Sequence, residues 1–545
     1  FDSGFPNATF EASATPGPGN RMNVVFKVQE GERIYVNRVL VSGNVFTRRN
    51  VINHALEIRS GNPMSQGDLL GTQQKLYDLG LFSQVDTAVQ NPDGVEPSKN
   101  VLVQVQEAKR YTFNYGAGFE FQTGQPNGTP LGGNGVSPLA SLGVSRINFR
   151  GRDHTITFES RVGRLQQRGL ISYDAPRWFG NPNWKLTFTG FFDHTLDVVT
   201  FTSQRLEGSV QAEQLLSQRL DGSPVSVLNY RFNYRLVKAS DVRVSPAQIP
   251  LLSLPVRVGG PGFNYIRNRR DNDLQTTRGS YITVDAGVAA RYFGSQADFS
   301  RILVQNSTYH PFGKLKGHRF VFARSTRVGL ENPFSATIIT QPGEQAPENR
   351  TLIPLAERFF MGGGNSHRGF GLNQAGPRDP ITGFPTGGSA LFLNNLELRL
   401  PPPTLPFVGD NLSFAIFHDM GNVFTDGTHM LDSLLRWHQD RGLCMQPPNT
   451  SFQIGVNGTI ASRCNYNYIS HAIGLGVFYR TPVGPVRLDF GYNLNPTVFP
   501  GVCQVTDGKC IAATSQSSNS PVTYEFVGTK QASPFNVYFS IGQTF

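Results

Sequence analysis

Residues 411–424 read NLSFAIFHDMGNVF and alternate between two kinds of side chain. Successive side chains of a β-strand point to opposite faces, so a period of two predicts a strand. A strand of this length with one largely apolar and one polar face is typical of a transmembrane β-barrel. The apolar face carries Leu412, Phe414, Ile416, His418 and Met420, and the opposite face carries Ser413, Ala415, Phe417, Asp419 and Gly421.

The same alternation recurs from residue 110 to the end of the chain, for example in YTFNYGAGFEF (111–121), VRLDFGYNL (486–494) and FNVYFSIGQTF (535–545). Short turns alternate with long polar segments, and that asymmetry is usual in outer-membrane barrels. We therefore expect a mainly β fold, an antiparallel transmembrane barrel of about 16 strands over residues 110–545. A large soluble all-β binding protein is the rival. The expected long loops are residues 334–388, 425–466 and 496–534.

Composition excludes several classes of protein. Charged residues make up 16% of the chain, against about 25% in soluble domains. The sequence has no run of about 18 apolar residues, which a membrane-spanning helix would need. The net charge of +10 is spread out, whereas nucleic-acid binding would need clustered Lys and Arg. We expect no nucleic-acid partner and no cofactor.

The chain begins at Phe1 without a Met, which indicates a processed form or a fragment.

The four cysteines all lie in the last fifth of the chain, in loop-like sequence. None forms a CxxC pair, so no metal site is expected. We predict two loop disulfides, Cys444–Cys464 and Cys503–Cys510, and hence an oxidising compartment.

A repeat marks the N-terminal boundary. NVVFKVQEGER (23–33) and NVLVQVQEAKR (100–110) are similar, which indicates a repeated module. Residues 1–31 would be the tail of one module and residues 32–109 the whole of the next. That module reads as β-α-α-β-β, with Thr47 and Ser65 as helix caps and Gly80 after the second helix. From GNVFTRRNVI to KLYDLGLFSQV it resembles a POTRA domain.

The loop sequence RFFMGGGNSHRGF (358–370) is rich in glycine and carries one arginine near its end. A dinucleotide loop would need glycine where His367 stands, and a phosphate loop would need lysine in place of Phe370. With the POTRA-like module, the barrel pattern and the aromatic C-terminus, this loop resembles the BamA/TamA-type outer-membrane barrel-assembly family. The two-partner-secretion transporters are the cousins of that family.

The resemblance implies that this loop folds back into the barrel lumen and that Arg368 pairs there with acidic side chains. Strand parity points Asp419 inward, within FHDMG, which matches the FxDxG motif of the family. Parity also points Glu397 inward, within LFLNNLELRL. The residues alone leave open that Arg368 is simply solvated, and His367 departs from the aliphatic residue usual before RGF. The expected lock motif is Gly363, Gly364, Arg368, Gly369 and Phe370.

The resemblance also implies a lateral seam between the first strand (about residues 111–122) and the last (about residues 535–545). Gly116 and Gly118 would weaken the first strand, since glycine weakens strands. On the last strand, the expected seam residues are Phe539, Gly542 and Phe545.

The function implied is folding and insertion of β-barrel proteins into the bacterial outer membrane, with the POTRA module in the periplasm. Implied partners are unfolded outer-membrane proteins, periplasmic chaperones, accessory lipoproteins and a bilayer containing lipopolysaccharide. The alternative is a two-partner-secretion polypeptide transporter. We expect no enzyme activity, because parity sends His418 and Asp419 to opposite faces and no serine nucleophile accompanies them.

Overall fold

The computed structural model of the chain describes most of its residues, and every structural statement below concerns these. They are residues 2–19, 21–92, 94, 96–219, 222–245, 249–273, 275–315, 318–334, 353–403, 411–444, 451–454, 464–481, 484–506, 509–512 and 522–541.

The module near the N-terminus is a three-stranded sheet with two helices. Strand β5 is central, parallel to β3 and antiparallel to β4. Ile52 and Leu76 from the helices pack on Val85 and Val103 from the sheet, and all four are fully buried. The predicted β-α-α-β-β order is confirmed. Its elements are β3 (Tyr35–Ser42), α1 (Arg49–Ala55), α2 (Gln66–Asp78), β4 (Phe82–Val89) and β5 (Ser98–Glu107).

The helix ends of this module follow their sequence signals with one exception. The Ser65 side chain accepts a hydrogen bond from the backbone of Asp68 and caps α2, and Gly80 follows that helix with φ +66°, both as predicted. The cap expected at Thr47 is wrong: α1 begins after Arg48 without a side-chain cap. The backbone N–H of Thr47 donates to Glu107 Oε1 at 2.6 Å, so a carboxylate on β5 holds the backbone just before this helix.

Residues before this module form a separate two-stranded sheet of β1 (Thr9–Gly17) and β2 (Arg21–Gln29), paired from end to end. The origin of residues 1–31 as the tail of a preceding module stays a prediction.

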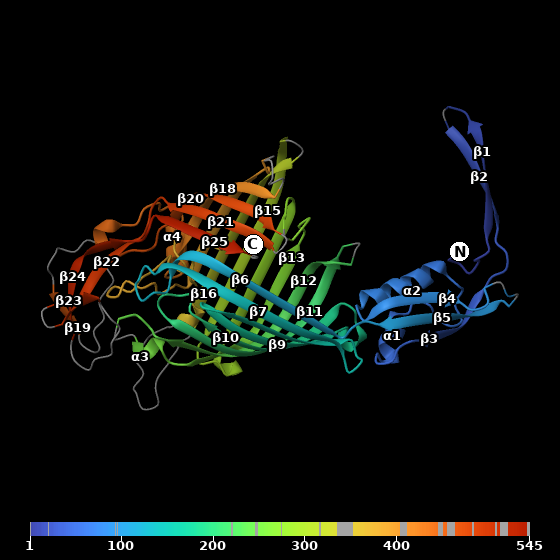
Figure 1. Cartoon of the computed structure of the whole chain (residues 1–545), viewed down its shortest axis with the longest axis horizontal. Coiled ribbons are helices and arrows are strands. Elements are labelled where there is room, and N and C mark those ends of the chain that lie inside the picture. Colours follow the sequence, from blue (N-terminus) through green and yellow to red (C-terminus); the bar gives the residue numbers. More distant parts are fainter. Residues whose placement is uncertain are drawn as a thin grey trace. The chain divides into compact units, whose positions relative to one another are not determined.

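The rest of the chain is dominated by a closed barrel of 16 antiparallel strands (Figure 1). Its last strand pairs with its first, so the sheet has no free edge. This confirms the predicted fold class. The barrel strands are β6 (Tyr111–Gln125), β7 (Gly133–Phe149), β8 (His154–Gly163), β9 (Gln166–Pro176), β10 (Trp184–Thr195), β11 (Thr202–Gln218), β12 (Pro224–Ser240), β13 (Val256–Asn268), β14 (Gly279–Ala289), β15 (Phe299–Leu315), β16 (His318–Pro333), β17 (Ala390–Leu400), β18 (Leu412–Phe424), β20 (Ser470–Thr481), β21 (Gly484–Asn493) and β25 (Phe535–Ile541).

The two faces of the wall differ as the alternation predicts. On β18, Ile416 is 47% exposed on the outer face, whereas its neighbours Ala415 and Phe417 are buried on the inner face. An outer face that leaves large apolar side chains uncovered is what a barrel presents to lipid. Among the described residues, no helix has both the length and the hydropathy needed to cross a bilayer.

Strands also form in the described parts of the long segments after β18 and β21. They build a four-stranded sheet in the order β19-β24-β22-β23, beyond the ends of β20, β21 and β25 in Figure 1. Its strands are β19 (Ser451–Ile454), β22 (Val498–Thr506), β23 (Lys509–Ala512) and β24 (Val522–Gln531). The remaining short elements are η1 (Trp178–Gly180), α3 (Ile249–Leu252), η3 (Arg291–Phe293), η4 (Leu355–Glu357), α4 (Gly427–Ser433) and η5 (Arg441–Cys444).

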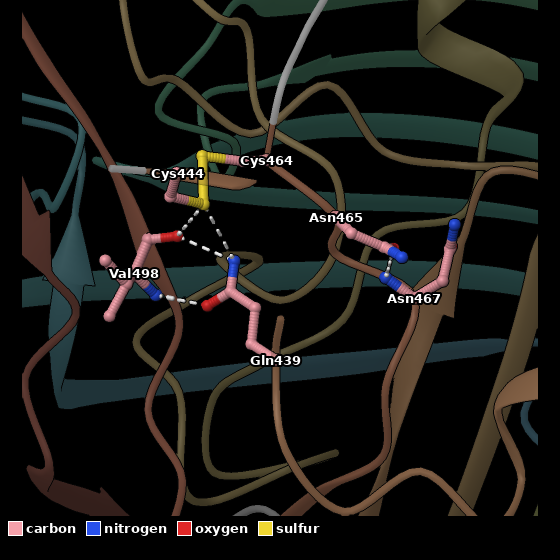
Figure 2. Close-up of a disulfide and its surroundings, with 6 residues drawn as sticks. All are labelled: Gln439, Cys444, Cys464, Asn465, Asn467 and Val498. Carbon is pink, nitrogen blue, oxygen red and sulfur yellow. Dashed lines mark hydrogen bonds between the residues drawn. A yellow bond between two sulfur atoms is a disulfide. The ribbon is translucent and has the colours of Figure 1, made fainter. Parts of the chain in front are cut away.

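A disulfide joins Cys444 to Cys464 within the segment after β18 (Figure 2). Beside it, the side chain of Gln439 donates to the carbonyl of Val498 at 2.8 Å and accepts from its N–H at 2.7 Å. These contacts attach the disulfide-bonded segment to β22. Cys503 is disulfide-bonded too, but the side chain of Cys510 lies outside the described residues, so that pairing stays a prediction.

Candidate functional site: a loop held inside the barrel

The segment between β16 and β17 turns back into the barrel. We call residues 353–389, the part that the structure describes, the lock loop. Its apolar side chains Met361 and Phe370 are buried with Leu391, Leu393 and Val423, which point inward from β17 and β18. Burial of this apolar surface favours the inward position of the loop.

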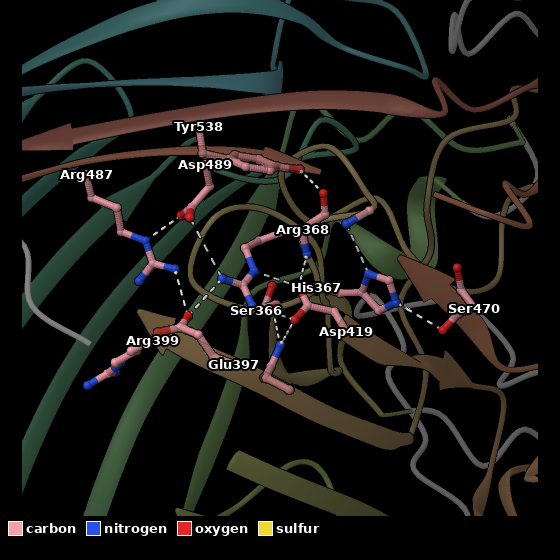
Figure 3. Close-up of polar contacts among 12 residues, drawn as sticks. Ser366, His367, Arg368, Glu397, Arg399, Asp419, Ser470, Arg487, Asp489 and Tyr538 are labelled. Atoms are coloured by element: carbon pink, nitrogen blue, oxygen red, sulfur yellow. Dashed lines mark hydrogen bonds and ion pairs between the residues drawn. The ribbon is translucent and has the colours of Figure 1, made fainter. Parts of the chain in front are cut away.

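Arg368 is the polar centre of the lock loop (Figure 3). Its Nε donates to Asp419 Oδ2 at 2.8 Å and its Nη2 to Asp419 Oδ1 at 2.7 Å. The backbone N–H of Arg368 adds a third bond to Asp419 Oδ2 at 2.9 Å. Asp419 is fully buried, and a forked guanidinium–carboxylate pair is the strongest arrangement available for two such groups. The structure thus brings these two predicted residues together.

Glu397 is the second carboxylate beside Arg368. Its Oε2 accepts from Arg368 Nη1 at 3.2 Å, while its Oε1 accepts from Arg399 Nε at 2.8 Å. Arg487 is bound to Asp489 and lies 3.5 Å from Glu397 Oε2. Three cations, Arg368, Arg399 and Arg487, thus face three anions, Glu397, Asp419 and Asp489, and the cluster is electrically balanced.

Two further groups position this cluster. Asn395 donates through Nδ2 to Asp419 Oδ1 at 2.7 Å and to the carbonyl of Ser366 at 2.8 Å. The guanidinium carbon of Arg368 lies 3.4 Å from the centre of the Phe417 ring, as in a cation–π contact. Both side chains come from the inner wall, so the strands themselves hold the pair in place.

His367, which the family pattern leaves unexplained, is fully buried. Its Nδ1 accepts from the N–H of Gly369 at 3.2 Å, so Nδ1 carries no proton. Its Nε2 therefore carries the proton and donates to the carbonyl of Ser470 at 3.1 Å. A neutral imidazole fits both partners and attaches the tip of the loop to β20, which an aliphatic residue could not do.

The glycines of the motif allow close approach. Gly363 has φ +103°, a conformation that other residues rarely adopt, and its N–H donates to the carbonyl of Phe370 at 3.0 Å. A Cβ on Gly369 would lie 2.6 Å from the Cβ of Ala472, and one on Gly364 would lie 3.1 Å from the Cβ of Tyr538. The loop can therefore lie directly on β20 and β25.

A second anchor of the lock loop was missed by the sequence reasoning. Glu357, in η4, accepts from Arg235 Nε at 2.8 Å and from Arg235 Nη2 at 2.5 Å. Both residues are buried. Here the wall supplies the arginine and the loop the carboxylate, the reverse of the Arg368 site. The sequence shows an arginine in an alternating strand and an acidic residue in a long loop, but nothing in it indicates that the two residues pair.

The junction between β25 and β6, which we call the seam, is described over residues 535–541 of the last strand. Residues 535–541 of β25 pair with β21 over seven positions, but only Tyr538, Phe539 and Ser540 pair with β6. Phe539 lies opposite Phe121 and stacks on Phe119, with ring centres 5.5 Å apart. Gly116 and Gly118 lie earlier in β6, outside the three pairs that the described residues form. The predicted seam residues Gly542 and Phe545 lie outside the described residues.

In the part of the chain that the structure describes, no group of three or more His, Cys, Asp and Glu side chains is placed to hold a metal ion. His418 lies on the outer face, with its Nε2 3.2 Å from His471 Nδ1, and does not join Asp419. The arrangement suits mechanical coupling between a loop and a wall.

The fold and this loop define an outer-membrane barrel with an attached POTRA module, and comparisons with known proteins agree. Residues 148–545 match the Omp85 superfamily domain, and residues 34–108 match the surface antigen variable number repeat, the POTRA family. The chain therefore belongs to the Omp85 superfamily.

The similar proteins are distant in sequence. The outer membrane protein assembly factor BamA of Nitratidesulfovibrio vulgaris is 21% identical over 87% of this chain and 50% of its own length. BamA of Neisseria meningitidis is 20% identical over 89% and 58% respectively. This chain thus spans little more than half of these relatives. The crystal structure of Haemophilus ducreyi BamA lacking POTRA domains 1–3 superposes with a TM-score of 0.68 at 15% identity, covering 97% of this chain and 91% of that one.

Proposed function

We propose that this protein folds β-barrel proteins and inserts them into the outer membrane through a seam that opens between β6 and β25. Membership of the Omp85 superfamily and relatives named as assembly factors support this function. The observation that carries the mechanism is the seam: within residues 535–541, the described part of the last strand, seven residues pair with β21 and three pair with β6.

The described part of this ladder holds few hydrogen bonds. Three residue pairs hold about three hydrogen bonds, each of which contributes about 0.5–1.5 kcal/mol net. Exposed strand edges are unfavourable in lipid, where no water satisfies them. An incoming strand that pairs with β6 or β25 restores the lost bonds. The energy for insertion then comes from the folding of the substrate, with no cofactor.

The lock loop spans this seam from inside. It bonds to β6 through the N–H of Leu372, which donates to the carbonyl of Thr123 at 2.9 Å. It bonds to β25 through Asn536, whose Nδ2 donates to the carbonyl of Gly369 at 3.0 Å, and through Tyr538, whose hydroxyl donates to the carbonyl of Phe370. The lock loop thus adds hydrogen bonds to both strands of the seam.

Arg368, Asp419 and Glu397 act in this proposal as the anchor that keeps the lock loop across the seam. The Glu357–Arg235 pair anchors the other part of the loop to β12. An insertion cycle would require the loop to keep its fold while its bonds to β6 or β25 are exchanged. Loss of either anchor should loosen the closed seam.

The POTRA module would lie in the periplasm and receive substrate. Its sheet has two edge strands, β3 and β4, to which an extended segment can add by β-augmentation. Unfolded outer-membrane proteins would be the substrates, delivered by periplasmic chaperones. Accessory lipoproteins and a bilayer containing lipopolysaccharide complete the proposed partners.

Reconstitution tests this function. Liposomes that contain the protein are mixed with an urea-unfolded β-barrel substrate, and folding is followed by the appearance of a heat-modifiable band on gels. We expect the substrate to fold faster in these liposomes than in empty liposomes or in liposomes that contain the heat-denatured protein. Equal rates in all three would refute the proposal. Appearance of an unfolded secreted polypeptide across the membrane, without a folded barrel, would support the transporter alternative instead.

A further inference from the structure

A short segment after β18 lies on the outside of the barrel rather than over its opening. We call residues 425–441, which include α4, the outer arm. Met430 of α4 is buried in a cluster with Val328, Leu330, Phe392 and Met420. Phe392 and Met420 belong to the outer faces of β17 and β18, whereas their neighbours Leu391 and Leu393 line the lock loop on the inside.

The outer arm is fixed to the wall at several points. Ser433 donates through its hydroxyl to the carbonyl of Asn467 at 3.0 Å, and the N–H of Ile469 donates to the carbonyl of Arg436 at 2.8 Å. Asn495 donates through Nδ2 to the carbonyl of Trp437 at 2.5 Å. These bonds hold the arm in one position against the start of β20.

The fixed arm carries a row of uncovered apolar side chains. Leu435 is 90% exposed, Leu431 is 65% and Trp437 is 60%. Leu434, between them, is exposed as well. Folded proteins seldom hold such a patch rigidly in water without a partner.

The patch continues the outer surface of the barrel. The Trp437 ring stacks on His471 with ring centres 4.3 Å apart, and His471 stacks on His418 at 5.4 Å. His418 is followed along the outer face of β18 by Ile416, which is exposed. Aromatic girdles of membrane barrels lie at this level, where the apolar band meets the head groups.

We propose that the outer arm is a membrane anchor whose apolar side chains insert into the outer leaflet at the boundary between head groups and acyl chains. Leu431, Leu435 and Trp437 extend the apolar band outward from β18 and β20, in the manner of an interfacial helix. The occupant is lipid because the patch is continuous with the lipid-facing wall. This anchoring is independent of whether the barrel inserts or transports polypeptides.

Trp437 supplies its own probe. The chain has three tryptophans, so replacing Trp178 and Trp184 by Phe leaves Trp437 alone. The purified variant is reconstituted into vesicles of phosphatidylcholine, with or without lipids brominated near the head of the acyl chains. We expect blue-shifted emission that brominated lipids quench strongly and that aqueous iodide quenches weakly.

The substitution Leu435→Asp in the same background should shift the emission to the red and reduce quenching by brominated lipid. A heat-modifiable gel shift confirms that the barrel of each variant is folded. The control variant is Thr428→Asp, which adds the same charge at an exposed polar position of the outer arm. It should leave quenching by brominated lipid intact. Iodide quenching equal to that of free tryptophan, with none by brominated lipid, would overturn the anchor. Protection that arises only after another protein is added would overturn it also.

Discussion

The Arg368→Ala variant tests the lock loop most sharply. The substitution removes three side-chain hydrogen bonds, two to Asp419 and one to Glu397, and keeps the backbone bond to Asp419. Asp419 then remains fully buried with only Asn395 and one N–H as partners. Removing one member of a buried ion pair costs about 3–5 kcal/mol.

That cost should appear as more frequent opening of the lock loop. At about 1.4 kcal/mol per factor of ten, it corresponds to an increase of roughly two to four powers of ten in the open population. Hydrogen exchange of the Leu372 amide reads this population, because that amide donates to the carbonyl of Thr123 on β6 only while the loop is docked.

The matched control is Arg231→Ala. Arg231 forms a forked pair with Asp285 at 2.6 and 2.7 Å between β12 and β14, with no bond to the lock loop. Its loss should leave exchange at Leu372 unchanged. The double variant Arg368→Ala/Asp419→Ala should recover part of the protection, since it leaves no unpaired charge. Unaltered exchange at Leu372 in Arg368→Ala would refute the lock.

Three further predictions concern single positions. Glu357→Gln leaves Arg235 buried beside a neutral partner, so proteolysis within residues 353–361 should accelerate in a timed digestion; an unchanged digestion rate would argue against the second anchor. Gly369→Ala places a Cβ 2.6 Å from that of Ala472 and should destabilise the docked loop by about 1–3 kcal/mol, seen as a lower temperature for the gel shift; an unaltered temperature would contradict the close approach. Burial raises the pKa of Glu107, but hydrogen bonds from Thr47 and Phe46 outweigh it and hold that pKa below its usual value. The resulting stability of the POTRA module is present above the unfolded pKa and is lost as pH falls through the lower folded pKa; Glu107→Gln should flatten this acid dependence of urea unfolding, and an equal slope would refute it.

Parity of single strands was enough to find one half of the site. A wall that faces lipid on one side imposes a period of two within each strand. This local pattern was enough to place Asp419, in residues 411–424, and Glu397, in LFLNNLELRL, on the inner face. The same alternation puts Asp489 on the polar face of VRLDFGYNL, yet its membership of the cluster depends on which strands are neighbours. That neighbour relation is a property of barrel closure and cannot be obtained from one strand.

The contacts of the lock loop could not be predicted from the sequence for a different reason. The Glu357–Arg235 pair joins residues 122 positions apart, and no local period relates them. Thr47 was misassigned because its local signal does not show that Glu107, 60 positions away, binds its backbone N–H and that the helix begins only after Arg48. Residues 496–534 were expected to be a loop because their composition is polar. Their described parts contain three strands, and β22 pairs with both β23 and β24.

Crosslinking of the seam tests the central proposal most directly. Phe121 and Phe539 are directly opposite across the seam, and such cross-strand positions are close enough for a disulfide. Phe490 and Val537 are the matched pair across the β21–β25 junction, which is paired throughout residues 535–541. We predict that oxidised Phe121→Cys/Phe539→Cys loses accelerated barrel folding in liposomes and regains it on reduction, whereas oxidised Phe490→Cys/Val537→Cys retains it. Full activity of the protein with its seam covalently closed would contradict the account.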